Sequence, residues 1–314
     1  MAVIAVSAWL AQAVLVSAVA EETDGNDAPA TEQATADPIP DDPPPATPVT
    51  ALELLQKSRD SLVYTRTSVN AKLREQVAIA GNSFEASGTY EAGVFPKLRL
   101  TFQTDVGKSR GALLEVCDGQ LLWTVQEVQV AGNDAPSVKI SRTVIADVLN
   151  AWGDNLDSPE AVLTAKLGVG GLPALLAALE RSMVFDAVKL DEHRGQPFSV
   201  IQGRWNDDYL ARFGGADGKP LPDYVPDRVR IYFDQQTLFP TRILYLKKAR
   251  AEARLPFQLL LSLEFSDIVL DGPVNDEQFR YAPPDEAQVE NRTSKILGLI
   301  EASKKPSTPA GDSP

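Results

Sequence analysis

Hydrophobic and polar positions follow two different periods along the chain. After Thr50 the small and apolar residues recur at helical spacing, which predicts an amphipathic helix with one buried stripe: Ala51, Leu54, Leu55, Ser58 and Leu62. Thr50 and Glu53 have the spacing of a capping box, so we expect the helix to begin there. From Ser68 the period changes to two, which is typical of a strand with one buried face.

This alternation continues through five consecutive segments. Short strands that follow one another through tight turns favour an antiparallel meander. Asp118-Gly119 gives a strong hairpin signal between the fourth and fifth segments. The predicted strands begin at Ser68 and then cover Phe84–Glu91, Leu98–Gln103, Leu113–Cys117 and Leu121–Val128.

The middle of the chain has helical patterns, and strands resume after it. Three helices are predicted, over Thr143–Trp152, Glu160–Leu167 and Leu172–Met183. The third is apolar on most sides, so we expect it to be covered. Four further strands are predicted over Phe198–Trp205, Val229–Phe233, Thr241–Leu246 and Phe257–Phe265. The last alternates throughout, which predicts one dry and one wet face.

The order of elements predicts an α+β fold, a curved antiparallel half-barrel (an unclosed β-barrel) with a helical lid or plug. A lid over an apolar concave face is a common form of ligand site. The predicted lining of the cavity is Phe84, Tyr90, Leu98, Leu100, Phe102, Leu114, Val116, Trp123, Leu259, Leu261 and Leu263. The predicted lid residues are Leu172, Leu175, Leu176 and Leu179. The same pattern is also compatible with a close-packed core, and the sequence leaves both interpretations open.

The first 48 residues have a different composition. Residues 1–20 are apolar, carry no charged side chain and end in Ala18-Val19-Ala20, which predicts a secretory signal cleaved before Glu21. The alternative is a membrane anchor. Residues 21–48 hold seven prolines, eight of the 43 acidic residues and none of the 30 basic ones. This predicts a disordered linker, followed by a folded domain over residues 49–302 and a disordered tail over 303–314.

Composition argues against several classes of protein. Without the linker, residues 49–314 hold 35 acidic and 30 basic residues, and this mildly acidic balance argues against a nucleic-acid partner. The single cysteine, Cys117, excludes an internal disulfide and a metal site of several cysteines. Export without disulfides fits a core that is large enough to need none.

Isolated motifs do not form a catalytic constellation. Gly107-Lys108-Ser109-Arg110-Gly111 fits a nucleophile motif, but it lies between two strands rather than on a strand-to-helix turn. The only histidine, His193, lies in a polar turn without partners for catalysis. The remaining candidates match no calcium or dinucleotide motif: Asp207, Asp208, Asp217, Asp223 and Gly168–Gly171. We therefore expect no enzyme activity, no metal and no cofactor.

Three segments together resemble a known family. They are Gly88-Thr89-Tyr90 with Phe95-Pro96-Lys97-Leu98-Arg99, the hairpin Val116–Val125, and the closing stretch Asp267–Pro284. Their order resembles the LolA/LolB-like superfamily of lipoprotein carriers, which includes RseB-type periplasmic regulators and mycobacterial lipid-binding lipoproteins. The resemblance covers Ala51 to Val289. The long stretch Arg204–Asp227 and the long linker depart from the family pattern.

This resemblance implies a carrier or sensor in the periplasm or cell envelope, with a lipid or an acylated protein as ligand. It also implies a possible envelope protein partner, only transient membrane contact, and no catalytic residues. The alternative is a non-catalytic structural or interaction protein of the envelope whose core is packed shut.

Overall fold

The computed structural model describes residues 49–79, 82–130, 132, 135–152, 170–193, 195–212, 221–249 and 256–304. The predicted signal segment, the linker and the predicted helix Glu160–Leu167 lie outside these residues. The same holds for the tail after residue 304.

The first described helix begins where the capping box predicts. Helix α2 (Ala51–Asp60) continues into a π-helical turn, η1 (Ser61–Thr65). The Glu53 backbone N–H donates to Thr50 Oγ1 at 3.2 Å, and the Thr50 N–H donates to a Glu53 carboxylate oxygen at 2.9 Å. The predicted stripe from Ala51 to Leu62 is buried. Both predictions are confirmed.

One sheet of thirteen strands forms the body of the described molecule, in the order β13-β6-β5-β4-β3-β2-β1-β12-β11-β10-β9-β7, with β8 also paired to β9. Every pairing is antiparallel except the one between β13 and β6. The first seven strands are β1 (Val69–Ile79), β2 (Asn82–Ala92), β3 (Leu98–Val106), β4 (Ser109–Cys117), β5 (Leu121–Gln129), β6 (Ser137–Val144) and β7 (Met183–Phe185). The others are β8 (Lys189–His193), β9 (Gln196–Trp205), β10 (Arg228–Asp234), β11 (Pro240–Lys248), β12 (Phe257–Leu270) and β13 (Val289–Asn291).

The sheet is open. Its two ends, at β13 and at β7 with β8, are not paired with each other. The pairing of β1 with β12 joins the meander of the first half to that of the second half. The predicted fold class, an α+β unclosed sheet with few helices, is therefore confirmed.

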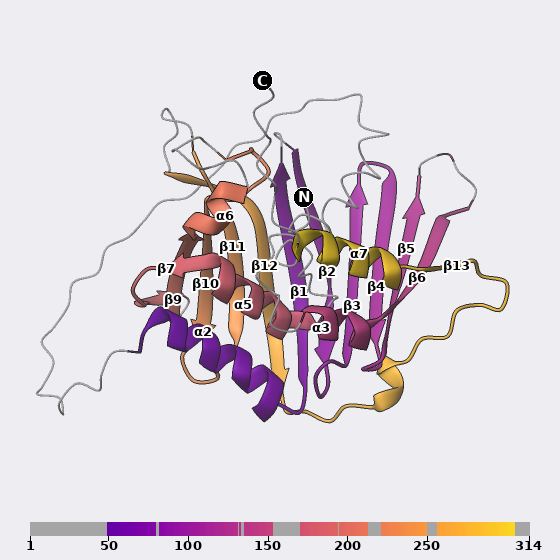
Figure 1. Ribbon diagram of the computed structural model, residues 1–314, viewed down its shortest axis with the longest axis horizontal. Coiled ribbons are helices and arrows are strands. Elements are labelled where there is room, and N and C mark those ends of the chain that lie inside the picture. Colours follow the sequence, from indigo (N-terminus) through magenta and orange to yellow (C-terminus); the bar gives the residue numbers. More distant parts are fainter. Residues whose placement is uncertain are drawn as a thin grey trace, which may run out of the picture.

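The longer helices lie in front of one face of the sheet (Figure 1). They are α2, α3 (Ile145–Trp152), α5 (Gly171–Ser182) and α7 (Thr293–Lys304). Each contributes buried apolar side chains to the same core as the strands behind it. A short helix, α6 (Asp207–Arg212), follows β9, and a 3-10 turn, η4 (Asp276–Phe279), follows β12.

Several sequence predictions were wrong in detail. The predicted helix from Thr143 begins only at Ile145, because Ser137–Val144 pairs with β5 as strand β6. A helix that the sequence patterns did not predict covers Thr293–Lys304. The predicted wet face of the last long strand is only partly exposed, because Leu260 and Ser262 are buried beside a register shift between β11 and β12.

Candidate ligand-binding site

The face of the sheet that the helices cover carries the larger part of the predicted cavity lining. Residues that pair directly across strands share a face, so the register assigns each side chain to a side. Tyr90 pairs with Leu100, and Leu98 pairs with Cys117. On the other half of the sheet, Leu261 pairs with Tyr245 and Leu263 with Ile243. The buried members of the predicted set on this inner face are Tyr90, Leu98, Leu100, Phe102, Leu261 and Leu263.

Three of the predicted lining residues lie on the opposite face. Val116 pairs with Arg99 and with Trp123, and Leu114 pairs with Thr101, so these side chains point away from the helices. The C-terminal segment covers part of this face. Trp123 contacts Tyr281 at 5.6 Å between ring centroids, and Arg99 Nη1 donates to the Gln278 carbonyl at 3.2 Å. A single cavity therefore cannot include Leu114, Val116 and Trp123 together with Leu98, Leu100 and Phe102.

The last two predicted lining residues, Phe84 and Leu259, lie near the ends of the central strands β2 and β12. Phe84 pairs with Val77 on β1 and is half-buried. Leu259 pairs with Leu246 beyond the register shift of β12 and is also half-buried.

Helix α5 covers the inner face with the four predicted lid residues. Leu172, Leu175, Leu176 and Leu179 are all buried in the shared core. The helix is tied to α2 by polar contacts: Gln56 Nε2 donates to Glu180 Oε1 at 2.7 Å, and Arg59 forms an ion pair with the same carboxylate. Polar side chains thus join the two helices to each other, and both helices also contribute apolar side chains to the core they share with the sheet.

The two ends of α5 are held differently. At the C-terminal end, Asn206 Nδ2 donates to the Arg181 carbonyl at 2.8 Å, and the Asn206 N–H donates to the Ser182 carbonyl at 2.9 Å. The chain then continues directly into β7, which pairs with β9. These contacts fix that end of α5 to the sheet.

At the N-terminal end, the sheet holds α5 through a side chain. The Leu172 N–H donates to Tyr90 Oη at 3.0 Å. Burial raises the pKa of Tyr90 to about 12, against the opposing effect of this hydrogen bond, so the hydroxyl is neutral at physiological pH. Tyr90 also meets Phe265 edge to face, with 5.6 Å between ring centroids.

Two glycines allow this close approach. Gly170 and Gly171 both have positive φ, 79° and 64°, a backbone conformation that other residues adopt at a cost. A Cβ on Gly171 would lie 2.7 Å from Tyr90 Oη. A side chain here would therefore push the start of α5 away from the sheet.

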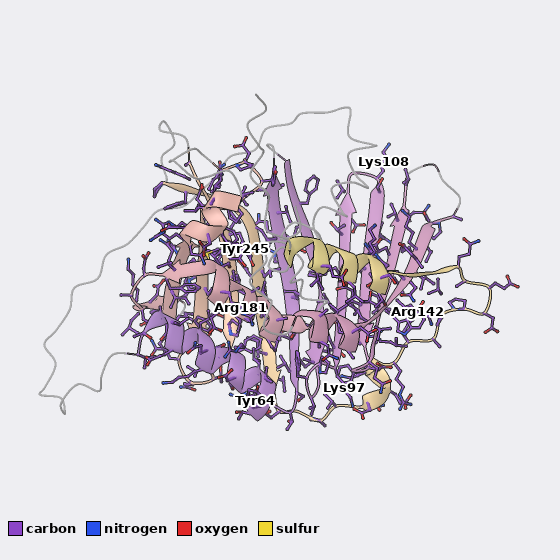
Figure 2. The ribbon with its side chains drawn as sticks, in the orientation of Figure 1. Tyr64, Lys97, Lys108, Arg142, Arg181 and Tyr245 are labelled. Carbon is purple, nitrogen blue, oxygen red and sulfur yellow. The ribbon has the colours of Figure 1, made fainter. Side chains whose placement is uncertain are left out.

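A small cavity lies beside these glycines. Its volume is about 20 Å³, and it is lined by residues that include Leu62, Tyr90, Phe95, Gly171 and Pro173. That volume suits roughly one water molecule. Lys97 also lines this cavity. Figure 2 shows Lys97 near the same end of the molecule as Tyr64, and Tyr64 is 82% exposed.

The inner face also carries buried polar groups. Glu75 pairs with Leu263 and Glu115 pairs with Leu100, and both side chains are buried. Burial and the nearby Glu75 carboxylate raise the pKa of Tyr245. Burial also raises the pKa of the Cys117 thiol to about 11, so this cysteine is a protonated core residue.

The other sequence candidates lie apart from this site. Ser109 begins β4 opposite Val106, so its motif forms a hairpin turn rather than a nucleophile elbow. His193 is exposed and pairs with Gln196. Asp207 and Asp208 are in the first turn of α6, and Asp217 lies outside the described residues. Within the described ranges, no group of three or more His, Cys, Asp or Glu could hold a metal ion.

Sequence reasoning missed the anchors of α5. It considered Gly168–Gly171 as a dinucleotide motif and Gly168 as a helix cap, and it did not consider that Gly170 and Gly171 permit the positive φ angles at the start of α5. Asn206 directly precedes the acidic start of α6, and its side chain accepts from the Tyr209 N–H at 3.0 Å, as a capping residue does. Nothing local in the sequence links Asn206 to α5.

Comparisons with known proteins give distant structural similarity. No protein-family model matches the chain, and no curated protein matches it by sequence. The MucA/MucB complex of Pseudomonas aeruginosa matches at 13% identity and a TM-score of 0.34, over 74% of this chain and 61% of that one. A LolA superfamily protein from Nitrosomonas europaea matches at 12% identity and a TM-score of 0.26, over 74% and 98%. LprF from Mycobacterium bovis matches at 12% identity and a TM-score of 0.34, over 72% and 94%.

These similar structures include the LolA superfamily that the sequence motifs resemble. The chain spans about three fifths of the MucB chain in that complex. Because all of these TM-scores lie below 0.5, the similarity does not by itself place the chain in a family. No helix within the described ranges is long and apolar enough to cross a membrane.

Proposed function

We propose that this chain is a non-catalytic envelope protein that binds an acyl chain or a similar apolar group between the inner face of the sheet and the helix layer. The observation that carries the proposal is the asymmetric attachment of α5. Its C-terminal end is fixed by Asn206 and β7, whereas its N-terminal end rests on Tyr90 beside a small cavity.

Such an attachment favours movement at one end. Among the described residues, opening the N-terminal end breaks the hydrogen bond between Leu172 and Tyr90 and separates apolar surfaces. An apolar ligand that enters there contacts the apolar surfaces of α5 and the sheet in place of their contact with each other, so these surfaces stay out of water. Because α5 is linked to α2 through Glu180, the two helices are expected to move together.

The cavity of about 20 Å³ is too small for an acyl chain, since ligand pockets usually measure about 300–1,000 Å³. In the proposed mechanism the described arrangement is the closed form of the site. Binding requires α5 to lift from Leu100, Phe102 and their neighbours, as a lid does over a ligand site.

Location and partners follow from the same proposal. The apolar segment over residues 1–20 supports export to the periplasm or envelope. In a water-filled compartment, an acyl chain is part of a lipid or of an acylated protein. The ligand therefore comes from one of these two classes. A protein that exchanges such a ligand contacts the membrane or an envelope partner transiently.

A second candidate function is a structural or interaction protein of the envelope with a packed core. The observation that favours it is the close covering of the inner face, where Leu100, Leu176 and Ile201 have no exposed surface. The two candidates make opposite predictions for added bulk on this face.

Leu261→Phe distinguishes them. If the inner face accepts ligand, the larger ring occupies ligand space, so binding of a fluorescent fatty-acid probe falls while stability is nearly kept. If the face is a packed core, the parent binds no probe and the variant loses about 1–3 kcal/mol of stability. Probe titration and thermal unfolding measure both effects, and native mass spectrometry of the parent detects lipid that co-purifies.

Leu114→Phe is the matched control, because it makes the same change on the opposite face. Equal loss of probe binding in both variants would contradict a site on the inner face. A parent protein without probe binding and without co-purified lipid would favour the structural role.

A further inference from the structure

An exposed strand, β8, forms part of one edge of the sheet. β8 pairs with β9, and in the part of the chain that the structure describes it pairs with no other strand. All five of its residues are exposed, and the side chain of Leu190 is 78% exposed. An unpaired edge strand presents a row of free backbone N–H and C=O groups that can pair with another chain.

Two charged side chains of β8 with opposite signs lie on the same face of the sheet. Lys189 pairs with Val200 and Asp191 with Phe198, so these two charges project from the same face of the sheet. Leu190 pairs with Ser199 and projects from the other face. The ion pairs among the described residues do not include Lys189 or Asp191.

We propose that β8 pairs with β8 of a second copy of this chain, antiparallel and about a two-fold axis at Leu190. In that register Lys189 of each copy lies opposite Asp191 of the other, and the two Leu190 side chains face each other. Opposite charges and apolar residues in directly opposed positions stabilise antiparallel strands.

Self-complementarity is the reason for choosing a second copy over another partner. Charged residues on an edge strand ordinarily oppose pairing. Here the signs alternate along one face, so an antiparallel copy turns both charges into attractive pairs. A two-fold axis also satisfies the isologous geometry that is common among homodimers.

The neighbouring surface along this edge is apolar. A groove of about 610 Å³ lies beside β7 and the start of α2, lined by residues that include Val49, Leu52, Val184 and Val188. Exposed apolar surface next to an open edge favours burial against a partner. Stable interfaces bury about 1,200–2,000 Å², and a five-residue edge supplies only part of that, so we expect a weak, concentration-dependent dimer.

Charge reversal tests the pairing by sedimentation of the purified full chain over a range of concentrations. Lys189→Asp places acids opposite acids, and Asp191→Lys places bases opposite bases. Each single variant is expected to dimerise at least about tenfold more weakly than the parent. An equimolar mixture of the two variants restores the opposite charges and is expected to associate as the parent does. Lys108→Asp, an exposed change in the β3–β4 turn, is the matched control and is expected to leave dimerisation unchanged.

Two results would overturn the proposal. One is a parent that stays monomeric at high concentration. The other is association that both single variants keep in full, because it would place the interface elsewhere. Recovery in the mixed sample supports it, and a mixture that stays monomeric contradicts the proposed register. Circular dichroism of each variant verifies that it is folded, and the positions are exposed, so the substitutions leave the core intact.

Discussion

At the scale of single residues, Tyr90 has the most informative position. The sequence predicted it as one apolar residue among several that line a cavity. In the structure its hydroxyl accepts the Leu172 N–H and its ring meets Phe265, so it joins the sheet to the start of α5. The same hydroxyl excludes any side chain at Gly171. Tyr90 thus carries the polar contact that the proposed opening of α5 would break.

Tyr90→Phe removes the hydroxyl and keeps the ring. We expect the free energy of unfolding to fall by about 1–2 kcal/mol, because the buried Leu172 N–H loses its acceptor. We also expect a fluorescent fatty-acid probe to exchange faster. Urea unfolding and stopped-flow displacement measure the two effects. Tyr232→Phe, a half-buried tyrosine on the opposite face, is the control, and an equal effect there would argue against a special role for Tyr90.

At the scale of elements, the sequence predicted the start of helix α2 and the turn between β4 and β5. It did not predict which face of the sheet the helices cover. The capping box at Thr50 and the Asp118-Gly119 hairpin depend on residues close in sequence, and both are present: Asp118 accepts from the Gln120 and Leu121 N–H groups, and Gly119 has a φ of 102°. Strand β4 carries apolar side chains on both faces, with Leu113 on one and Leu114 and Val116 on the other. The alternation of apolar and polar residues therefore could not show which face the helices cover.

Short or weakly patterned elements escaped prediction for a related reason. β7 and β13 have three residues each, too few for a period to be recognised. β13 is a strand because β6 lies beside it, which is a long-range contact that no local signal records. The candidate site divides in the same way. The helical pattern of α5 predicts that its leucines are buried, and they are, whereas the contacts of Tyr90 and Asn206 with α5 depend on residues far apart in the sequence.

Leu175→Ala tests whether α5 acts as the lid. The truncation removes apolar contact between α5 and the core, so we expect faster probe exchange with a smaller change in probe affinity, and a stability loss of about 2–5 kcal/mol. Stopped-flow exchange and chemical unfolding give the two numbers. Leu297→Ala on α7 is the matched control, since that residue also packs against the core. Faster exchange in the α7 variant alone would assign the lid to α7.

At the scale of the whole molecule, the folded part is a single sheet with helices on one face, preceded by an acidic, proline-rich stretch. The two parts have different physical characters. The sheet and helices share one apolar core, whereas residues 21–48 offer little apolar surface to bury and repel one another through like charges.

Deleting residues 21–48 should leave the melting temperature unchanged within error, because the segment has little to contribute to packing. Calorimetry of the parent and the shortened protein measures this. Deleting residues 293–304 is the contrasting control, since α7 buries Ile300, and it should lower the melting temperature. A fall of several degrees on removal of residues 21–48 would show that the segment packs on the domain.

The pairing of β1 with β12 also governs how the chain folds as it is made. Val69 lies opposite Leu270, so two strands at the centre of the sheet are separated by about two hundred residues of sequence. Until β12 is synthesised, β1 has an unpaired edge in the interior of the future sheet, and the strand that joins the first meander to β11 is missing. Contacts of such long sequence separation slow folding and prolong the exposure of strand edges. Chains that end before Leu270 should therefore be aggregation-prone, and the nascent protein should depend on chaperones until its last long strand emerges.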